Sequence, residues 1–377
     1  MSNVTTVALE LQSALGKRSG IGNYTYELAK RLQDEADLHF CGNVFNFLGR
    51  NDNSASLLGI DISICECKDF PYGVYRRLWH WLPVRYDRLF GAADLSIFFN
   101  YIVPPRISGR VMTTIHDLTW LRCPETMDSK NLRRIKKDID YSIERADKIL
   151  TVSGFSKQEM MSLLKLPAEQ IAVVPCAAGE MPESADFAEI ANKYNLAKPY
   201  LLYVGNIEPR KNLPRLLQAF DLLKTEQNLP HKLVIAGGSG WGNGEFQQTL
   251  QKMKWSDDVV QVGYVEAALK RALYENAAAF VFPSLYEGFG IPPLEAMSCC
   301  CPVVCAKAAS LPEVVGEAAE LVEPLSVPSI AEGIWQVVSN EDRAAELKAK
   351  GYEQVKKFSW EKSANKLKSV CREVLGV

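Results

Sequence analysis

The stretch VFPSLYEGFGIPPLEAMSCCCPVV (residues 281–304) contains one complete strand–loop–helix–strand unit. Its first apolar run ends near Pro283, and a helical pattern begins near Pro292, because proline is tolerated in the first turn of a helix. The next apolar run, PVVCAK (302–307), follows directly. Apolar runs that do not alternate predict strands buried on both faces. Strand–helix–strand order therefore predicts a parallel sheet with a crossover helix.

The same unit repeats along the chain on the N-terminal side of this stretch. Further strands are predicted at 4–11, 38–45, 61–67, 95–100, 111–118, 148–153, 171–177, 200–206, 232–238, 259–265 and 279–284. Helices are predicted at 23–36, 130–147, 212–226, 266–277 and 293–299.

Two sets of strands are separated by AAGEMPESADFAEIANKYNLAKP (177–199), which is polar and lacks a strand pattern. We therefore predict an α/β protein with two doubly wound parallel-sheet domains that face each other across a cleft. The predicted parts are an N-terminal domain (1–178), a linker region (179–199), a C-terminal domain (200–357) and an amphipathic C-terminal helix (358–377).

The composition is that of an ordinary globular protein. The 377 residues carry 43 basic and 45 acidic side chains, which argues against the strongly basic surface of a nucleic-acid-binding protein. Three of the ten cysteines are consecutive (299–301), and none forms a Cys-x-x-Cys pair. Free thiols in a reducing cytoplasm are therefore expected, rather than disulfides or zinc. Neither a signal peptide nor a membrane-spanning stretch is expected.

Two carboxylates flank a loop that suits an anion. Residues 288–291 (Gly-Phe-Gly-Ile) precede the predicted helix, and amide N–H groups at a helix N-terminus favour negative charge. Glu287 comes before this loop, and Glu295 follows it within the first helical turn. Carboxylates repel phosphate, but they accept hydrogen bonds from sugar hydroxyls.

Two other loops suit phosphate. Arg210 and Lys211 follow the strand at 200–206, and adjacent cations at a strand's carboxyl end suit a diphosphate; a solvated surface pair is the alternative. Gly20 and Gly22 lie in a turn before the helix predicted from residue 23. They either allow a backbone to approach a phosphate or only make a tight turn. The third glycine of an NAD fingerprint is replaced by Thr25, which argues against a dinucleotide.

Phosphate-binding cations, an amide cradle and hydroxyl-accepting carboxylates are together the chemistry of a nucleotide-diphosphate sugar site. The spacing Glu-x7-Glu within SLYEGFGIPPLEAM (284–297) resembles the signature of the retaining family 4 glycosyltransferases of the GT-B fold. GNIEPRKN (205–212) and LPEVVGEAAELVEP (311–324) resemble the donor domain of the same family. The resemblance implies two Rossmann-like domains and a C-terminal helix that crosses back to the first domain.

The resemblance also implies a role for each matching position. Glu287 would contact the transferred sugar, and Glu295 would hold the donor ribose. Arg210 and Lys211 would neutralise the leaving diphosphate. Gly205 and Asn206 at the end of the strand would also contact the donor, although many family members have an arginine at the second of these positions. Gly20 and Gly22 would face the diphosphate from the N-terminal domain, and Tyr264 and Val265 would lie near the nucleobase. Donor contacts are also implied for the loop of Gly288, Phe289, Gly290 and Ile291.

In the N-terminal domain, TTIHDLTW (113–120) is a strand that runs into His116 and Asp117. His116 matches the position of the family's cleft histidine, which implies contact with the donor sugar or the acceptor. A structural histidine is the alternative, and Asp117 is the weaker candidate of the two.

Asp138 and Asp140 imitate an Asp-x-Asp metal motif, but they lie in a helical pattern after four basic residues. We interpret them as a solvated helix face. Because Arg210 and Lys211 already offset phosphate charge, neither a divalent metal nor another cofactor is expected.

The segment 70–90 (FPYGVYRRLWHWLPVRYDRLF) carries seven aromatic residues and a net charge of +3. Tyr75, Trp79, Leu82 and Tyr86 roughly follow helical spacing. The composition is typical of interfacial helices and of aromatic acceptor platforms. The segment is thus either a membrane-facing or lipid-acceptor element or an ordinary packed helix.

These features predict a retaining, metal-independent glycosyltransferase that transfers a hexose to a lipid-linked or polysaccharide acceptor, as in O-antigen synthesis. Resemblance to bacterial polysaccharide mannosyltransferases favours mannose from GDP-mannose. The alternatives are another sugar from a UDP or dTDP donor, or a non-catalytic nucleotide-sugar-binding subunit. The expected location is cytoplasmic, in part on the inner face of the cell membrane, with no nucleic-acid partner.

Overall fold

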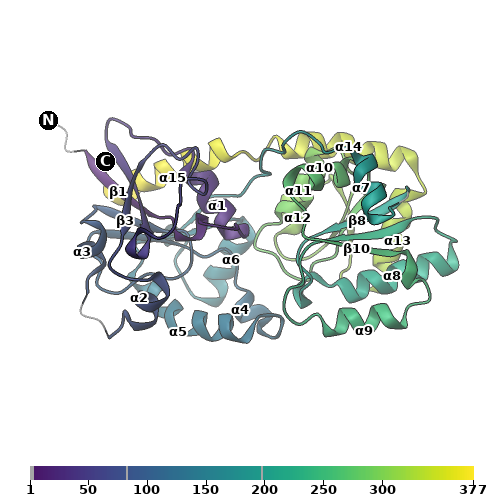
Figure 1. Ribbon diagram of the computed structural model, residues 1–377, viewed down its shortest axis with the longest axis horizontal. Coiled ribbons are helices and arrows are strands. Elements are labelled where there is room, and N and C mark those ends of the chain that lie inside the picture. Colours follow the sequence, from purple (N-terminus) through teal and green to yellow (C-terminus); the bar gives the residue numbers. More distant parts are fainter. Residues whose placement is uncertain (1–3, 82–83, 197) are drawn as a thin grey trace. The chain divides into compact units, whose positions relative to one another are not determined.

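The computed structural model describes residues 4–81, 84–196 and 198–377. The chain divides into two compact units, one for each predicted sheet (Figure 1). The first unit comprises Met1–Leu118, Arg133–Cys176 and Trp360–Val377, and the second comprises Thr119–Leu132 and Ala177–Ser359. Among the described residues, no helix has the length and apolar character needed to span a membrane.

The first unit contains a seven-stranded sheet with the order β3-β2-β1-β4-β5-β6-β7. Every pairing in it is parallel, and β1 lies between β2 and β4. The strands are β1 (Thr5–Glu10), β2 (Leu38–Phe45), β3 (Ser63–Cys67), β4 (Leu95–Phe98), β5 (Arg110–Thr114), β6 (Lys148–Thr151) and β7 (Ile171–Val173). The helices of this part of the chain are α1 (Gly20–Ala29), α2 (Tyr72–Leu78), α3 (Tyr86–Phe90), α5 (Ser129–Arg145), α6 (Gly154–Leu163) and α15 (Trp360–Leu375).

The second unit contains a six-stranded parallel sheet with the order β10-β9-β8-β11-β12-β13. Its strands are β8 (Tyr200–Val204), β9 (Lys232–Ala236), β10 (Val259–Gly263), β11 (Ala279–Phe282), β12 (Val303–Ala306) and β13 (Ala319–Val322). Its helices are α4 (Thr119–Arg122), α7 (Phe187–Tyr194), α8 (Leu213–Glu226), α9 (Gly244–Lys252), α10 (Ala267–Asn276), α11 (Ile291–Ser298), α12 (Leu311–Val315), α13 (Val327–Val338) and α14 (Glu341–Val355).

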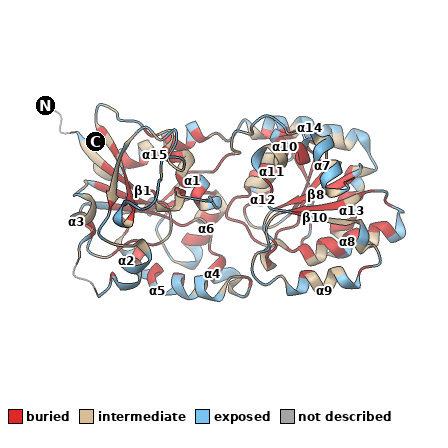
Figure 2. Cartoon of the chain, in the orientation of Figure 1, coloured by how far each residue is buried: buried red, intermediate tan, exposed pale blue. Residues whose placement is uncertain are grey.

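The central strands form the core of each unit, as the continuous apolar runs predict. Every residue of β4, β8, β11 and β12 is buried (Figure 2). Strands covered on both faces need helices on both sides of the sheet, and the connections between parallel strands supply them. The two doubly wound, Rossmann-like sheets predicted from the sequence are therefore confirmed.

Three local features differ from the sequence prediction. Helix α1 begins at Gly20 rather than at residue 23, because the Ser19 hydroxyl accepts a hydrogen bond from the amide of Gly22 and caps the helix there. The linker region contains α7, whose Phe187 ring stacks on Tyr200 of β8. Strand β13 was not predicted, because its short sequence AELV has no extended apolar run.

The unit boundaries also depart from contiguous segments. Residues Thr119–Leu132 belong to the second unit, where the Trp241 indole N–H donates to the Thr126 carbonyl oxygen at 2.8 Å. Helix α15 belongs to the first unit. Its Arg372 forms ion pairs with Glu35 and Asp37, and its Ser363 hydroxyl donates to the Pro175 carbonyl oxygen at 2.7 Å.

The aromatic segment 70–90 forms two short helices, α2 and α3, rather than one. Tyr75, Trp79 and Tyr86 are buried in one apolar cluster, so the packed interpretation holds for these three side chains. Leu82, which was predicted to share their face, lies outside the described residues.

Candidate active site

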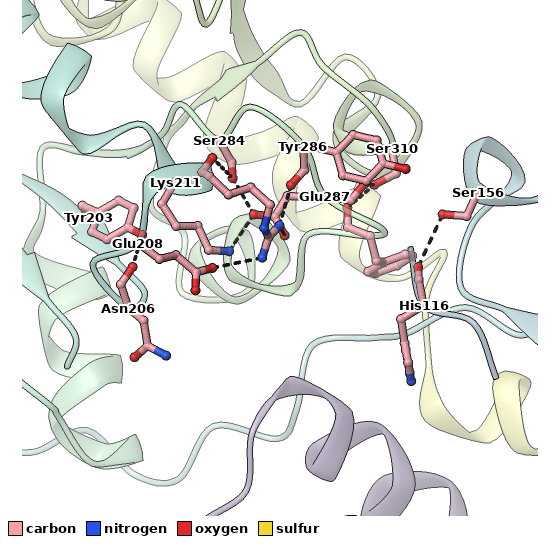
Figure 3. A network of polar contacts seen from close by, with 12 residues as sticks. His116, Ser156, Tyr203, Asn206, Glu208, Lys211, Ser284, Tyr286, Glu287 and Ser310 are labelled. Carbon is pink, nitrogen blue, oxygen red and sulfur yellow. Dashed lines mark hydrogen bonds and ion pairs between the residues drawn. The ribbon is translucent and has the colours of Figure 1, made fainter. Parts of the chain in front are cut away.

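The predicted site residues of the second unit gather where its strand order reverses, between β8 and β11. In a doubly wound sheet, the loops that leave two such strands run to opposite sides and leave room for a ligand at the carboxyl ends. The loop after β8 carries Arg210 and Lys211, and the loop after β11 carries Ser284 and Glu287. Figure 3 shows the side chains of Lys211, Ser284 and Glu287 pointing toward one another.

Glu287 is the centre of a buried ion cluster. Its Oε1 accepts from the Lys211 ammonium at 2.6 Å and from the Ser284 hydroxyl at 2.5 Å. Its Oε2 lies 2.8 Å from a guanidinium nitrogen of Arg210. The side chain of Glu287 is only 11% exposed, so water screens these contacts weakly.

The surroundings of Glu287 keep it ionised. Burial alone raises the pKa of its carboxyl, but Arg210, Lys211 and the Ser284 hydroxyl outweigh burial and lower the pKa to about 2. Net attraction in a buried site requires a well-satisfied geometry, and three donors on one carboxylate meet that requirement.

Arg210 is held on three sides. Its guanidinium donates to the Tyr286 carbonyl oxygen, and it lies 3.1 Å from the buried carboxylate of Glu208. Two cations thus face two carboxylates, Glu208 and Glu287, and the cluster carries no formal net charge. The predicted cations are therefore partnered, with side chains only 15% and 13% exposed, and the solvated-pair alternative is excluded.

Backbone contacts fix the loop that carries Glu287. The Ser310 hydroxyl lies 2.8 Å from the Glu287 carbonyl oxygen and 2.9 Å from that of Phe289. Gly290 has φ +112°, and a Cβ there would lie 2.6 Å from a methyl group of Leu311. Only glycine fits this conformation and this space without strain.

Asn212 ties the two loops together. It adopts the left-handed conformation at the start of α8, and its amide donates to the Pro283 carbonyl oxygen at 3.0 Å and to that of Pro324 at 2.7 Å. One side chain thereby links the loop after β8 to the end of β11.

Helix α11 begins at Ile291, as the prolines predict, and no side chain caps its N-terminus. The loop of Gly288, Phe289, Gly290 and Ile291 therefore lies where the sequence placed it. Glu295, one turn into this helix, accepts from the Lys270 ammonium at 2.6 Å and from the Tyr274 hydroxyl at 3.3 Å.

The remaining donor-domain candidates follow β8 and β10. Gly205 and Asn206 follow β8, where the Asn206 carbonyl oxygen accepts from the Tyr203 hydroxyl at 3.1 Å. Tyr264 is 60% exposed directly after β10, whereas Val265 beside it is buried. The donor roles of these four residues stay predictions.

Gly20 and Gly22 are placed differently from the sequence prediction. They form the first turn of α1 and not a loop before it. A Cβ on Gly22 would lie 2.4 Å from the Ser13 carbonyl oxygen, whereas Gly20 has open space around it. Close packing against Ser13 thus accounts for Gly22, and Gly20 leaves an exposed helix start.

His116 follows β5, and its ring is held in one orientation. Nε2 lies 2.8 Å from the Phe99 carbonyl oxygen, and the Tyr24 ring meets the imidazole edge-on at 5.0 Å. Burial lowers the pKa of His116, so the ring is neutral. A proton on Nε2 then leaves Nδ1 as a hydrogen-bond acceptor. Asp117 is half-buried beside it.

The Asp138 and Asp140 prediction is wrong for one residue. Asp138 is buried and lies 2.9 Å from Nε2 of His80, because it occupies the inner face of α5. Asp140 is exposed. Across the described residues, no group of three or more potential ligands could hold a metal ion.

Sequence reasoning missed five residues that support the site: Glu208, Ser284, Ser310, Lys270 and Tyr274. Glu208 is adjacent to the predicted cations, so a search for their counter-ions along the loop would have found it. Ser284 lies three residues before Glu287 in the same loop and was likewise within reach of the sequence. Ser310, Lys270 and Tyr274 come from other segments, and only the fold brings them to this site.

Comparison with known proteins identifies two matching family descriptions. Glycosyltransferase Family 4 matches residues 18–178, and Glycosyl transferases group 1 matches residues 186–354. O-antigen chain mannosyltransferase B of Escherichia coli is 34% identical over 360 residues, which cover 91% of this chain and 93% of the relative. Serotype-specific mannosyltransferase WbdA of the same species is 29% identical over 69% of this chain but only 33% of its own length.

Solved structures share the fold at low sequence identity. Sucrose-phosphate synthase of Thermosynechococcus elongatus matches with a TM-score of 0.74 and 19% identity, covering 99% of both chains. HepE of Anabaena, solved with UDP and glucose, matches with a TM-score of 0.72 and 16% identity, covering 98% of this chain and all of the other.

The pKa of Glu287 yields a test of the ion cluster. Because its folded pKa of about 2 lies below the ordinary 4.5, the ionised carboxylate contributes stability that is present above the ordinary value and lost as pH falls through the folded value. We expect Glu287→Gln to lower the free energy of unfolding by ~3 kcal/mol near neutral pH. The difference from wild type should shrink in acid. Urea unfolding at several pH values measures it, and a pH-independent difference would contradict the cluster's electrostatic role.

Proposed function

This chain is a member of the family 4 glycosyltransferases of the GT-B fold, and from that premise we propose that it transfers mannose from GDP-mannose to a polysaccharide acceptor with retention of configuration. The observation that carries the proposal is the Glu287–Arg210–Lys211 cluster at the strand reversal of the second sheet. The names of the relatives, O-antigen chain mannosyltransferase B and the mannosyltransferase WbdA, support the sugar and the polymer.

The proposed reaction needs stabilisation of the leaving diphosphate. The Lys211 ammonium donates to Glu287 and, having three N–H groups, can also donate to phosphate oxygens. Amides at the start of α11 add partial positive charge at the same strand ends. Because the four charged side chains cancel one another, the incoming diphosphate meets fixed dipoles and donors without a large opposing charge.

Glu287 would then act on two parts of the donor, the transferred sugar and, through the cations, the diphosphate. Three of its roughly four acceptor positions are taken by Arg210, Lys211 and Ser284. The remaining position can accept a hydroxyl of the transferred sugar, while the ion pairs hold the cations in place for the diphosphate. Glu295 is proposed to hold the ribose, with Lys270 and Tyr274 orienting its carboxylate.

In the proposed mechanism the acceptor oxygen forms its bond to the anomeric carbon on the face from which the diphosphate departs. The bond from that carbon to the diphosphate oxygen breaks, and the proton of the acceptor hydroxyl passes to the leaving diphosphate. No enzymic nucleophile and no divalent metal take part, since Arg210 and Lys211 offset the developing charge. His116 contributes as a neutral acceptor: its Nδ1 would accept a hydrogen bond from a sugar hydroxyl.

We also propose contact with the membrane surface through α2. Val74, Leu78 and Trp81 are exposed and spaced i, i+4 and i+7, so they share one side of the helix and its continuation. Trp81 is 83% exposed, and the neighbouring Arg77 is exposed as well. Exposed apolar side chains beside a cation suit the surface of anionic lipids.

The donor prediction is tested by thermal shift with GDP, UDP, ADP and dTDP. GDP at about a hundredfold excess over its Kd should raise the melting temperature by several degrees. The shift should be the same in EDTA and in magnesium if the diphosphate is bound without a metal. A larger shift with UDP or dTDP would replace the proposed donor, and a shift with none of the four would contradict the function.

The role of Glu287 is tested by separating transfer from diphosphate binding. Glu287→Gln should lower turnover by about 100-fold because the cations and the sugar lose their common anchor. Its affinity for GDP should stay equal or rise, because a negative charge near the phosphates is removed. Lys211→Ala should lower both turnover and GDP affinity.

Glu332→Gln, an exposed carboxylate on α13, is the matched control for these two variants and should behave as wild type. Near-wild-type turnover of Glu287→Gln would contradict its place in the reaction.

Membrane contact is tested by co-sedimentation with vesicles containing anionic lipid. Trp81→Ala combined with Leu78→Ser should reduce the bound fraction several-fold. Leu325→Ala, which removes a comparably exposed side chain of the second unit (70% exposed), should leave binding unchanged. If the Trp81→Ala/Leu78→Ser variant bound the vesicles as well as the Leu325→Ala variant, a role for this side of α2 would be contradicted.

A further inference from the structure

A second polar site lies in the first unit, at the reversal of its own strand order between β1 and β4. A narrow pocket opens there, lined by the carboxyl ends of these strands and by α2 and α3. Its polar lining residues are Glu10 at the end of β1, Arg76 of α2 and Asn100 after β4. Its aromatic lining residues are Phe45, Tyr72, Tyr75, Trp79, Tyr86 and Phe98.

Polar atoms beside this pocket lack protein partners. The Tyr75 hydroxyl and the Asn43 Oδ1 atom are buried, and neither meets a hydrogen-bond partner among the described residues. Tyr75 is 1% exposed and lines the pocket. Asn43 is the register neighbour of Glu10 on β2, and its amide lies 3.5 Å from the Tyr86 hydroxyl. Buried polar groups in folded proteins normally form hydrogen bonds. Two buried polar atoms without a hydrogen-bond partner beside one pocket therefore indicate that the pocket binds a polar group.

Glu10 has an unusual environment for a carboxylate. The Gln12 amide donates to its Oε1 at 3.2 Å. Burial raises the pKa of Glu10 to about 7, and the Gln12 amide and Arg76 counteract burial only in part. This carboxyl contrasts with Glu287, which accepts from three donors. Hydroxyl donors brought by a ligand would supply what Glu10 lacks.

The chemistry of the pocket selects one class of ligand. Aromatic faces pack against the C–H face of a sugar ring, and carboxylate, amide and hydroxyl groups bind its hydroxyls. An aliphatic lipid chain would leave the orphaned atoms and Glu10 unsatisfied, and a phosphate, which only accepts hydrogen bonds, would leave the Asn43 Oδ1 atom without a donor. The free space inside is about 20 Å³, enough for one hydroxyl group or one water molecule.

We propose that this pocket is a subsite for a hexose of the acceptor glycan, which inserts one hydroxyl between Glu10 and Tyr75 while its ring stays outside the pocket, against Tyr72, the one lining aromatic residue that is not buried. The proposal rests on the glycosyltransferase function proposed above. It assigns to the pocket the recognition of the acceptor, through residues that take no part in holding the donor.

The test compares two tyrosines that differ in one respect. The Tyr75 hydroxyl has no protein partner, whereas the Tyr26 hydroxyl donates to the Leu58 carbonyl oxygen at 2.7 Å. Tyr75→Phe should therefore keep or raise stability and weaken sugar binding. Tyr26→Phe should lower stability slightly and leave sugar binding unchanged. If Tyr75 had a purely structural role, Tyr75→Phe would instead lower stability and leave sugar binding unchanged.

The measurement is saturation-transfer NMR on the full chain with the methyl glycosides of mannose, glucose, galactose and N-acetylglucosamine. Wild type should bind at least one of them, and Tyr75→Phe and Glu10→Gln should each weaken that binding by about fivefold or more. GDP binding, measured in parallel by thermal shift, should be the same in wild type and all variants.

Each outcome decides between the two proposals. Unchanged glycoside binding in both pocket variants, or no binding to wild type while GDP binds, would overturn the acceptor subsite and leave the proposed transferase function intact. Failure of every nucleoside diphosphate to bind wild type would overturn the function on which the subsite rests.

Discussion

The reversal of strand order in each parallel sheet is the constraint on which the rest of the structure depends. In the first sheet it falls between β1 and β4, and in the second between β8 and β11. Loops that leave these strands run in opposite directions, so the strand ends between them stay uncovered by a crossover helix. In both sheets the unusual polar groups gather there: Glu287 with Arg210 and Lys211 in one, Glu10 with Asn100 and Arg76 in the other.

The ion cluster in the second unit compensates the cost of removing two cations from water. Arg210 and Lys211 would be costly to bury alone, because an isolated charge loses its hydration. Glu287 and Glu208 compensate them, and the Tyr286 carbonyl oxygen and the Ser284 hydroxyl occupy further donor and acceptor positions. The cations are thereby fixed before a ligand arrives. Preorganised donors need little reorganisation when negative charge develops, which is the main source of electrostatic stabilisation in enzymes.

The sequence predicted the fold because its signals are repeated and local. Apolar runs placed the central strands, and prolines placed the start of α11, each within a few residues of the observed bounds. Glu287, Arg210 and Lys211 were found because they adjoin such strands. Ser310 and Lys270 were not, since their contacts join segments far apart in the chain. Gly20 and Gly22 were misplaced because one serine cap shifted the helix start by a turn. The aromatic segment was ambiguous because α2 has apolar side chains on two faces, one buried and one exposed.

The two polar sites differ in how far the protein satisfies them, and this difference indicates what each one binds. Around Glu287 the charged groups are already paired with one another, and a ligand meets only the Lys211 N–H groups and the one Glu287 acceptor position that these pairs leave over. Around Glu10 the network is unfinished, with an orphaned hydroxyl, an orphaned amide oxygen and a carboxyl that burial holds partly protonated near neutral pH. Such a site is completed by neutral groups that both donate and accept, and the hydroxyls of a sugar do both. A phosphate only accepts hydrogen bonds and would leave the Asn43 Oδ1 atom unpaired, so the unfinished network favours the hydroxyls of a glycan.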